Sequence, residues 1–291
     1  MIISASYRTD IPAFFAPWFQ RRYQAGYCLV HNPYSGKPYK VSLLPEDVTG
    51  IVFWTRNASP FTENLRLVAD AGIPFIVSYT LTGYPRILET SGRPRASVID
   101  DMQKLRDLYG PAAVVWRYDP ILFTSLTPLP FHYENFASLA QSLRNVVDEV
   151  VVSFAQIYQK TERNLQVAAE QHGLIWDDPA PDEKQQILRQ LAGIAGENKL
   201  RISLCAQREL LVEGVADAAC VDAGRLSRIA GRNITVPRKP HRNECGCFAS
   251  RDIGEYDTCP YGCVYCYAVR NQALARKRFK NHNPDSEFLY G

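Results

Sequence analysis

The stretch Gly50-Ile-Val-Phe-Trp-Thr-Arg-Asn57 contains four consecutive apolar residues followed directly by polar ones. A near-continuous apolar run of this length is typical of a parallel strand that is buried on both faces. The stretch Val150-Val-Val-Ser-Phe154 has the same character. Both stretches therefore predict strands of a parallel sheet.

Short strand-like runs of this kind alternate with longer amphipathic segments up to about residue 230. The predicted strands are 2–6, 50–54, 75–80, 113–118, 150–154, 201–205 and 218–221. The predicted helices are 60–71, 97–109, 133–147, 161–172 and 182–194. Repeated strand-helix-strand units imply right-handed crossovers, and this number of units favours an α/β fold built as a full or partial TIM-like barrel.

The helix predicted over residues 97–109 has its apolar residues three or four positions apart. Val98, Met102, Leu105 and Leu108 are expected to form one buried face. Ser97 is expected to cap the first turn with its hydroxyl oxygen.

Polar residues follow several predicted strands directly, as in Tyr7-Arg-Thr-Asp10 and Arg117-Tyr-Asp119. The carboxyl ends of barrel strands are where such folds place their chemistry. A guanidinium binds a carboxylate in a bidentate manner, and an acidic side chain suits a ribose diol. The candidate substrate-binding or catalytic residues are Arg8, Asp10, Arg56, Arg117 and Asp119, and the candidate cofactor-binding residues are Asn57, Arg117 and Asp119.

Seven of the eight cysteines lie after residue 200, and this clustering indicates metal binding. Cys259, Cys263 and Cys266 have C-x3-C-x2-C spacing, which suits three irons of a 4Fe-4S cluster and leaves the fourth iron open to S-adenosylmethionine (SAM). A second group consists of Cys205, Cys220, Cys245 and Cys247, and four thiols suit either a second 4Fe-4S cluster or a structural zinc. Cys28 stands apart and is expected to be a small buried apolar residue.

A different pairing of the cysteines gives an alternative function. Cys245 and Cys247 could join Cys263 and Cys266 in a zinc ribbon, with the basic residues between 270 and 280 forming a nucleic-acid arm. The protein would then be a zinc-ribbon-containing barrel protein that binds nucleic acid or performs metal-assisted hydrolysis. This pairing leaves Cys259 unexplained.

Charge and hydropathy exclude some classes of protein. The net charge of +3 does not by itself predict a polyanionic partner, and no apolar run is long enough to cross a membrane. The segment 1–8 lacks the basic and apolar regions of a secretory signal, so a cytoplasmic protein is expected. The cysteine distribution divides the chain into a barrel domain, residues 1–240, and a cluster-binding segment with a basic tail, residues 241–291.

The segment from Glu244 to Ala268, together with 6–12, 53–57 and 116–120, resembles an uncharacterised bacterial family known as a domain of unknown function and considered radical SAM-like. A more distant similarity is to spore photoproduct lyase, which has a similar C-x3-C-x2-C motif. This wider resemblance implies a partial barrel and reductive cleavage of SAM to methionine and a 5'-deoxyadenosyl radical, which abstracts hydrogen from a substrate.

The resemblance also implies an electron donor such as flavodoxin or ferredoxin, and an aromatic residue near the adenine of SAM, for which Tyr265 is the candidate. The substrate is not specified and could be a small molecule, a peptide or a nucleic acid. One feature departs from the wider pattern, because the cysteine loop usually follows the first barrel strand and here follows the last. The thiamine-pyrimidine synthase family offers a parallel for this late position.

Overall fold

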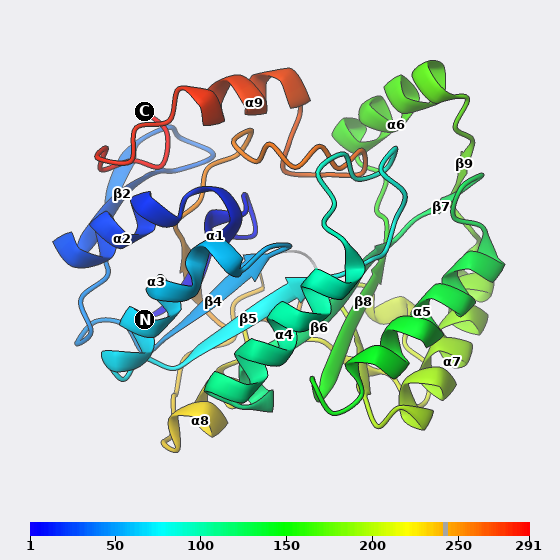
Figure 1. Cartoon of the computed structure of the whole chain (residues 1–291), viewed down its shortest axis with the longest axis horizontal. Coiled ribbons are helices and arrows are strands. Elements are labelled where there is room, and N and C mark those ends of the chain that lie inside the picture. Colours follow the sequence, from blue (N-terminus) through cyan, green and yellow to red (C-terminus); the bar gives the residue numbers. More distant parts are fainter. Residues whose placement is uncertain (241–243) are drawn as a thin grey trace.

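The computed structural model describes residues 1–240 and 244–291 of the chain. In these residues the centre of the molecule is an eight-stranded sheet in which neighbouring strands run parallel (Figure 1). In spatial order its strands are β11 (Ala216–Asp217), β10 (Arg201–Leu204), β8 (Glu149–Phe154), β6 (Val114–Ile121), β5 (Phe75–Thr80), β4 (Gly50–Thr55), β1 (Ile2–Ala5) and β12 (Ser250–Asp252).

From β1 to β11 each successive strand is added on the same side of the preceding one, as in a barrel. The chain then returns and places β12 on the other side of β1. Within the described residues β11 and β12 are the two edges of the sheet, so the barrel is not closed. The predicted α/β fold with a parallel sheet is therefore confirmed, in an open form that is compatible with a partial barrel or a Rossmann-like arrangement.

Side chains of the sheet alternate between two cores. In β4, Ile51 and Phe53 pack into the core shared with the outer helices, whereas Val52 points to the opposite face. The outer helices include α3 (Thr62–Asp70), α4 (Arg95–Tyr109), α5 (Leu129–Leu143) and α7 (Pro181–Glu197). The opposite face is covered by α8 (Ala223–Ala230) and by the second group of cysteines. Burial on both faces explains why the strands are apolar almost throughout.

Three local predictions were wrong. Helix α4 begins at Arg95 after Pro94, so Ser97 lies inside the first turn and does not cap it. Val98, Met102 and Leu105 are buried, but Leu108 is 64% exposed because, at about 100° per residue, it lies well off their stripe. The strand expected over 218–221 is β11, two residues earlier, and 218–221 is a loop.

In the described residues the remaining elements are a hairpin, four helices, a short strand pair and three short turns. The turn at residues 32–37 joins β2 (Tyr27–His31) and β3 (Pro38–Ser42) in an antiparallel hairpin. The other elements are α1 (Ile11–Phe14), α2 (Ala16–Ala25), α6 (Gln159–His172), α9 (Gln272–Lys280), the β7 (Phe123–Thr124) and β9 (Trp176–Asp177) pair, and three-residue turns at 59–61, 111–113 and 208–210. In Figure 1, α6 and α9 lie at the top of the view, and α8 lies at the bottom.

The C-terminal segment contacts both edges of the sheet. Near β11, the backbone N–H of Phe248 donates to the Val221 carbonyl over 3.1 Å, and the next residues form β12 beside β1. The expected domain boundary at 240/241 falls at residues 241–243, which lie outside the described residues. No helix in the described part of the chain has the length and apolarity needed to cross a bilayer.

Candidate functional site

A cavity of about 890 Å³ lies at the carboxyl ends of the strands. Its wall contains residues that follow β1, β4, β8 and β10, residues in the second half of β6, and part of the C-terminal segment. Thirteen residues singled out from the sequence line it: Arg8, Asp10, Arg56, Arg117, Asp119, Tyr265, Cys205, Cys220, Cys245, Cys247, Cys259, Cys263 and Cys266. Asn57 is not among its described lining residues.

The loop that carries Cys259, Cys263 and Cys266 is held by the loop after β5. The N–H of Val264 donates to the Leu88 carbonyl over 3.1 Å, and the N–H of Ser91 donates to the Tyr261 carbonyl over 3.1 Å. Gly262 has a φ of +79°, and a Cβ at this position would lie 2.8 Å from the Thr90 hydroxyl oxygen. The first gap of the motif therefore requires glycine for both its backbone conformation and its close packing.

The three thiols of this loop, which we call the triad, are close enough to influence one another electrostatically. Burial raises the pKa of Cys263 to about 12, with the charges of Glu89 and Cys266 acting in the same direction and Arg56 opposing them. Burial likewise raises the pKa of Cys259 well above its ordinary value, with the charges of Asp10, Cys266 and Cys263 acting in the same direction. Three neighbouring thiols with raised pKa values gain most from a cationic partner, because a bound metal ion stabilises the thiolate form.

Arg56, Glu89 and Tyr265 form a buried network beside the triad. Arg56 donates from Nη1 to Glu89 Oε2 over 2.7 Å and from Nη2 to the Tyr265 hydroxyl. Tyr265 donates its own hydroxyl proton to Glu89, and its ring meets Tyr84 edge-on with 6.0 Å between centroids. Tyr265, the residue expected near adenine, is thus a cavity-lining side chain whose hydroxyl is held in place.

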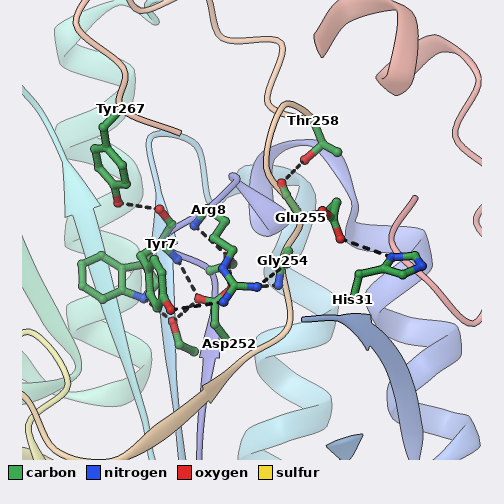
Figure 2. A network of polar contacts seen from close by, with 11 residues as sticks. Tyr7, Arg8, His31, Asp252, Gly254, Glu255, Thr258 and Tyr267 are labelled. Atoms are coloured by element: carbon green, nitrogen blue, oxygen red, sulfur yellow. Dashed lines mark hydrogen bonds and ion pairs between the residues drawn. The ribbon is translucent and has the colours of Figure 1, made fainter. Parts of the chain in front are cut away.

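Arg8 lies in a second network, between the start and the end of the chain (Figure 2). The Asp252 carboxylate accepts hydrogen bonds from the Ser4 and Ser6 hydroxyls, both 2.7 Å, and from the backbone N–H groups of Tyr7 and Gly254. Arg8 Nε lies 3.7 Å from Asp252, outside hydrogen-bond distance, and its terminal nitrogens make only 3.4 Å contacts. The guanidinium of Arg8 is therefore buried but weakly bonded.

Figure 2 also shows how this network reaches the cysteine loop. The hydroxyl of Tyr267, next to Cys266, donates to the backbone carbonyl of Tyr7 over 2.5 Å. On the other side, His31 Nδ1 lies 3.5 Å from the Glu255 carboxylate. The residues after β1 and the residues around the triad are thus one connected wall of the cavity.

Two of the predicted polar residues are engaged in holding the backbone. Asp10 caps α1, accepting from the Ala13 N–H over 2.9 Å, and also accepts from the Arg56 N–H over 2.8 Å. Burial raises its pKa to about 6, although these hydrogen bonds oppose the shift. Asn57 accepts from Arg93 over 2.8 Å through its side-chain oxygen. The side-chain oxygen of Asn57 therefore contacts Arg93 and the N–H of Ser59, neither of which is among the described lining residues of the cavity.

Arg117 and Asp119 connect β6 to the second group of cysteines. Arg117 donates from Nη1 to Cys220 Sγ over 3.0 Å and from Nε to Asp119 over 3.1 Å. The Asp119 carboxylate also accepts from the Ser153 hydroxyl. The Arg117 guanidinium lies over the Trp54 ring, 5.0 Å from its centroid. This cation thus has a carboxylate, an aromatic ring and a sulfur as neighbours.

The second group of cysteines, which we call the tetrad, is brought together from three separate segments. Cys205 follows β10, Cys220 follows β11, and Cys245 and Cys247 precede β12. Cys205 Sγ lies 3.2 Å from Cys220 Sγ, Cys220 also contacts Cys247, and Cys247 contacts Cys245. Hydrogen bonds from Cys205 and Cys247, supported by Arg117, lower the pKa of Cys220 well below its ordinary value.

In the described part of the chain, no three His, Cys, Asp or Glu side chains already stand around one point as metal ligands. The cysteines are nevertheless sorted into two groups by their contacts. Cys245 and Cys247 belong with Cys220, whereas Cys263 and Cys266 are electrostatic neighbours of Cys259. This sorting differs from the pairing that a zinc ribbon would need.

Glu89 and Asp252 are two buried acids of the site that sequence reasoning missed. Glu89 lies in the loop after β5, and no motif or periodicity marks it. Asp252 lies in β12, whose three residues pair with β1 across nearly the whole length of the chain. The charge of Asp252 within the cysteine-rich segment was a signal that could have marked this residue. Its hydrogen-bond partners lie near the start of the chain, and residue spacing does not predict them.

Comparison with known proteins gives a family but no close relative. No curated protein sequence matches the chain significantly. Two solved structures are similar at low level: a D-hydantoinase, with 10% identity over 70% of this chain and a TM-score of 0.32, and a protein assigned as an alpha-L-fucosidase from Bacteroides thetaiotaomicron, with 8% identity over 88% of this chain and a TM-score of 0.28. The chain covers 41% of the first protein and 95% of the second, and neither score carries an argument. A family model described as a domain of unknown function, DUF1848, matches residues 2–268, and the chain therefore belongs to this family.

Proposed function

We propose that this protein is a radical SAM enzyme, built on a partial TIM-like barrel, whose 4Fe-4S cluster is held by Cys259, Cys263 and Cys266. One observation carries the proposal: the triad, the polar residues that follow β1 and β4, and Arg117 and Asp119 of β6 line the same cavity. A cavity of about 890 Å³ is at the upper end of the about 300–1,000 Å³ usual for ligand sites, so it can hold a cofactor and a substrate together.

The donor set fits an iron-sulfur cluster. The triad provides three soft thiolate ligands from one loop, and the wall around it includes the aromatic side chains of Tyr261 and Tyr265. Thiolates match iron in softness, and an apolar aromatic wall limits the access of water. When bound, the cluster would supply an electron to SAM, and an electron donor such as flavodoxin or ferredoxin would replace it.

The protein residues would orient and shield the reactants. The Arg56–Glu89–Tyr265 network fixes the cysteine loop against the loop after β5, because each of its members is bonded to the other two. Arg56 and Arg117 are each hydrogen-bonded to a carboxylate, whereas Arg8 lies 3.7 Å from Asp252, which already accepts four other hydrogen bonds. Arg8 is therefore our choice to bind an anionic group such as the carboxylate of SAM.

Replacement of one triad cysteine tests the proposal. We expect Cys263→Ala to abolish both the visible absorbance of the reconstituted cluster and the formation of 5'-deoxyadenosine from SAM on reduction with dithionite. Iron analysis, absorbance and product chromatography on anaerobically reconstituted protein are the measurements. Cys28→Ala is the matched control, because Cys28 is also buried but lies in β2, and this variant should retain both signals.

The wild-type protein decides the function class directly. If it takes up no iron above background and forms no 5'-deoxyadenosine, the proposal is wrong. If Cys263→Ala retains full iron content and SAM cleavage, the triad is not the cluster site.

Arg8→Met is the companion variant, and it should weaken SAM binding at least tenfold while iron content stays at the wild-type level.

A further inference from the structure

We propose that the tetrad, Cys205, Cys220, Cys245 and Cys247, is a structural zinc site that is separate from the triad. The four thiols come from segments up to 42 residues apart in sequence and are linked by sulfur contacts from Cys205 to Cys220, Cys247 and Cys245. None of the eight cysteines, all of which lie within the described residues, forms a disulfide in this structure. Four converging thiols without a disulfide are the ligand set of a closed tetrahedral zinc site.

The spacing of the sulfurs favours a single metal ion over a second iron-sulfur cluster. Sulfurs around a tetrahedral zinc ion with bonds of about 2.3 Å lie about 3.8 Å apart. The 3.2 Å between Cys205 and Cys220 Sγ is slightly shorter than this separation. Thiolates on different irons of a cubane must lie farther apart, because the inorganic core stands between them. A single zinc ion therefore needs a smaller increase in the Cys205–Cys220 sulfur separation than a cubane does.

Hydrogen-bond donors near the tetrad sulfurs would stabilise these cysteines as thiolate ligands. Arg117 Nη1 lies 3.0 Å from Cys220 Sγ, and the N–H of Val221 donates to Cys247 Sγ over 3.4 Å. A zinc ion with four thiolates carries two net negative charges, so a buried guanidinium and an N–H group stabilise it and orient its ligands. The apolar residues Ala218, Val221 and Ile234 pack in the same cluster as the tetrad, whose four cysteines also line the cavity.

The surroundings of Gly246 show that the segment with Cys245 and Cys247 packs closely against the loop after β11. A Cβ at this position would lie 2.8 Å from the backbone carbonyl oxygen of Ala218, next to the loop that carries Cys220. Glycine between Cys245 and Cys247 therefore allows these two thiols to approach the loop after β11. With all four positions filled by protein, the site has no open coordination position, and its role would be to join the C-terminal segment to the β10–β11 edge of the open sheet.

The test uses the full chain purified anaerobically from cells supplied with both zinc and iron. The variant Cys259→Ala, Cys263→Ala, Cys266→Ala removes the triad and keeps the tetrad. We expect this variant to contain one zinc per chain and no iron, with X-ray absorption showing four sulfur ligands at about 2.3 Å. Cobalt substitution should give the visible absorption of tetrahedral cobalt thiolate, and this measurement needs no change in the tetrad itself.

Other outcomes would overturn the proposal. These are about four irons in the triad variant, loss of zinc on removal of the triad, or a metal-free tetrad with a Cys205–Cys220 disulfide in mass spectrometry. Because these results concern the triad variant, they are independent of whether the intact protein cleaves SAM.

Gly246→Ala retains all four thiols and should lose zinc to a chelator at least tenfold faster than wild type, whereas Cys28→Ala should match wild type. Equal rates for Gly246→Ala and wild type would contradict the fitted geometry.

Discussion

Asp10 shows how one side chain can couple structure to pH. Its carboxylate caps α1 and accepts the Arg56 N–H, so it joins the segment after β1 to the segment after β4. Asp10 is only 7% exposed, and this burial raises the pKa of its carboxyl group from 3.8 to about 6. The folded protein therefore binds this proton more tightly than the unfolded chain does.

We expect the contribution of Asp10 to stability to be fully present below about pH 4 and to be lost as pH rises through about 6. A shift of about two units corresponds to about 3 kcal/mol. Asp10→Asn cannot ionise, so its free energy of unfolding should decrease less than that of wild type between pH 4 and 7. Urea denaturation at both pH values measures this difference. An unchanged pH dependence in the variant would show that Asp10 has an ordinary pKa.

Glu89 is the residue of the site whose loss should cost the most stability. Glu89→Gln leaves Arg56 buried without a counter-ion, and breaking a buried ion pair costs about 3–5 kcal/mol. The control is Glu63→Gln, which removes the exposed Arg66–Glu63 pair and should change stability by less than about 1 kcal/mol. Thermal and urea unfolding would measure both. Equal effects of the two changes would contradict the buried network.

At the scale of elements, the cysteine loop depends on the loop after β5. The contacts of Val264 with Leu88 and of Ser91 with Tyr261 dock the motif against a segment more than 160 residues away. Gly262 lies at the centre of this docking. The C-x3-C-x2-C spacing is therefore supported by tertiary packing as well as by its own backbone conformation.

Gly262→Ala should destabilise the protein by about 2–4 kcal/mol, since the positive φ costs about 1–2 kcal/mol and the overlap with Thr90 adds to it. Gly72→Ala separates the two effects, because Gly72 has a φ of +69° and nothing within 4 Å of the added Cβ. We expect Gly72→Ala to cost about 1–2 kcal/mol in the same denaturation experiment. A smaller cost for Gly262→Ala than for Gly72→Ala would be inconsistent with the docked loop.

At the scale of the whole molecule, the end of the chain returns to its beginning. Trp18 donates its indole N–H to the Ser286 carbonyl over 3.0 Å, and the Leu29 N–H donates to the Glu287 carbonyl over 2.9 Å. Leu289 is buried in the same core as α2 and β2. The C-terminal residues therefore belong to the main core.

Leu289→Ala should lower the free energy of unfolding by about 2–4 kcal/mol, because it removes a buried side chain and leaves a cavity. Leu108→Ala changes the same chemical group at a site that is 64% exposed and should have an effect below about 1 kcal/mol. Calorimetry should show a single transition shifted to lower temperature for Leu289→Ala. An unshifted transition would mean that the tail is not part of the cooperative fold.

Most of the strands could be predicted from sequence, because burial on both faces leaves a continuous apolar run such as 51–54. Errors occurred where local signals were weak. Ser97 was expected to cap a helix that starts two residues earlier, and β11 has only two residues. Leu108 lies one position before Tyr109, which continues the buried stripe of the helix. The polar residues of the cavity were identified because strand ends mark them, but Glu89 has no such mark.

The sequence by itself determined the parallel α/β fold, the family and the three-cysteine motif, because apolar runs and close spacing are local properties. Only the tertiary structure decided which distant residues meet. The cysteine loop follows the last strand in sequence, yet β12 pairs with β1, and Tyr267 bonds to Tyr7. The loop therefore lies beside the first strand in space, since pairing between strands depends on hydrogen bonds that sequence distance does not limit. The sequence predicted the division of seven cysteines into triad and tetrad but left a ribbon pairing open, and the contacts of the folded chain follow the first division.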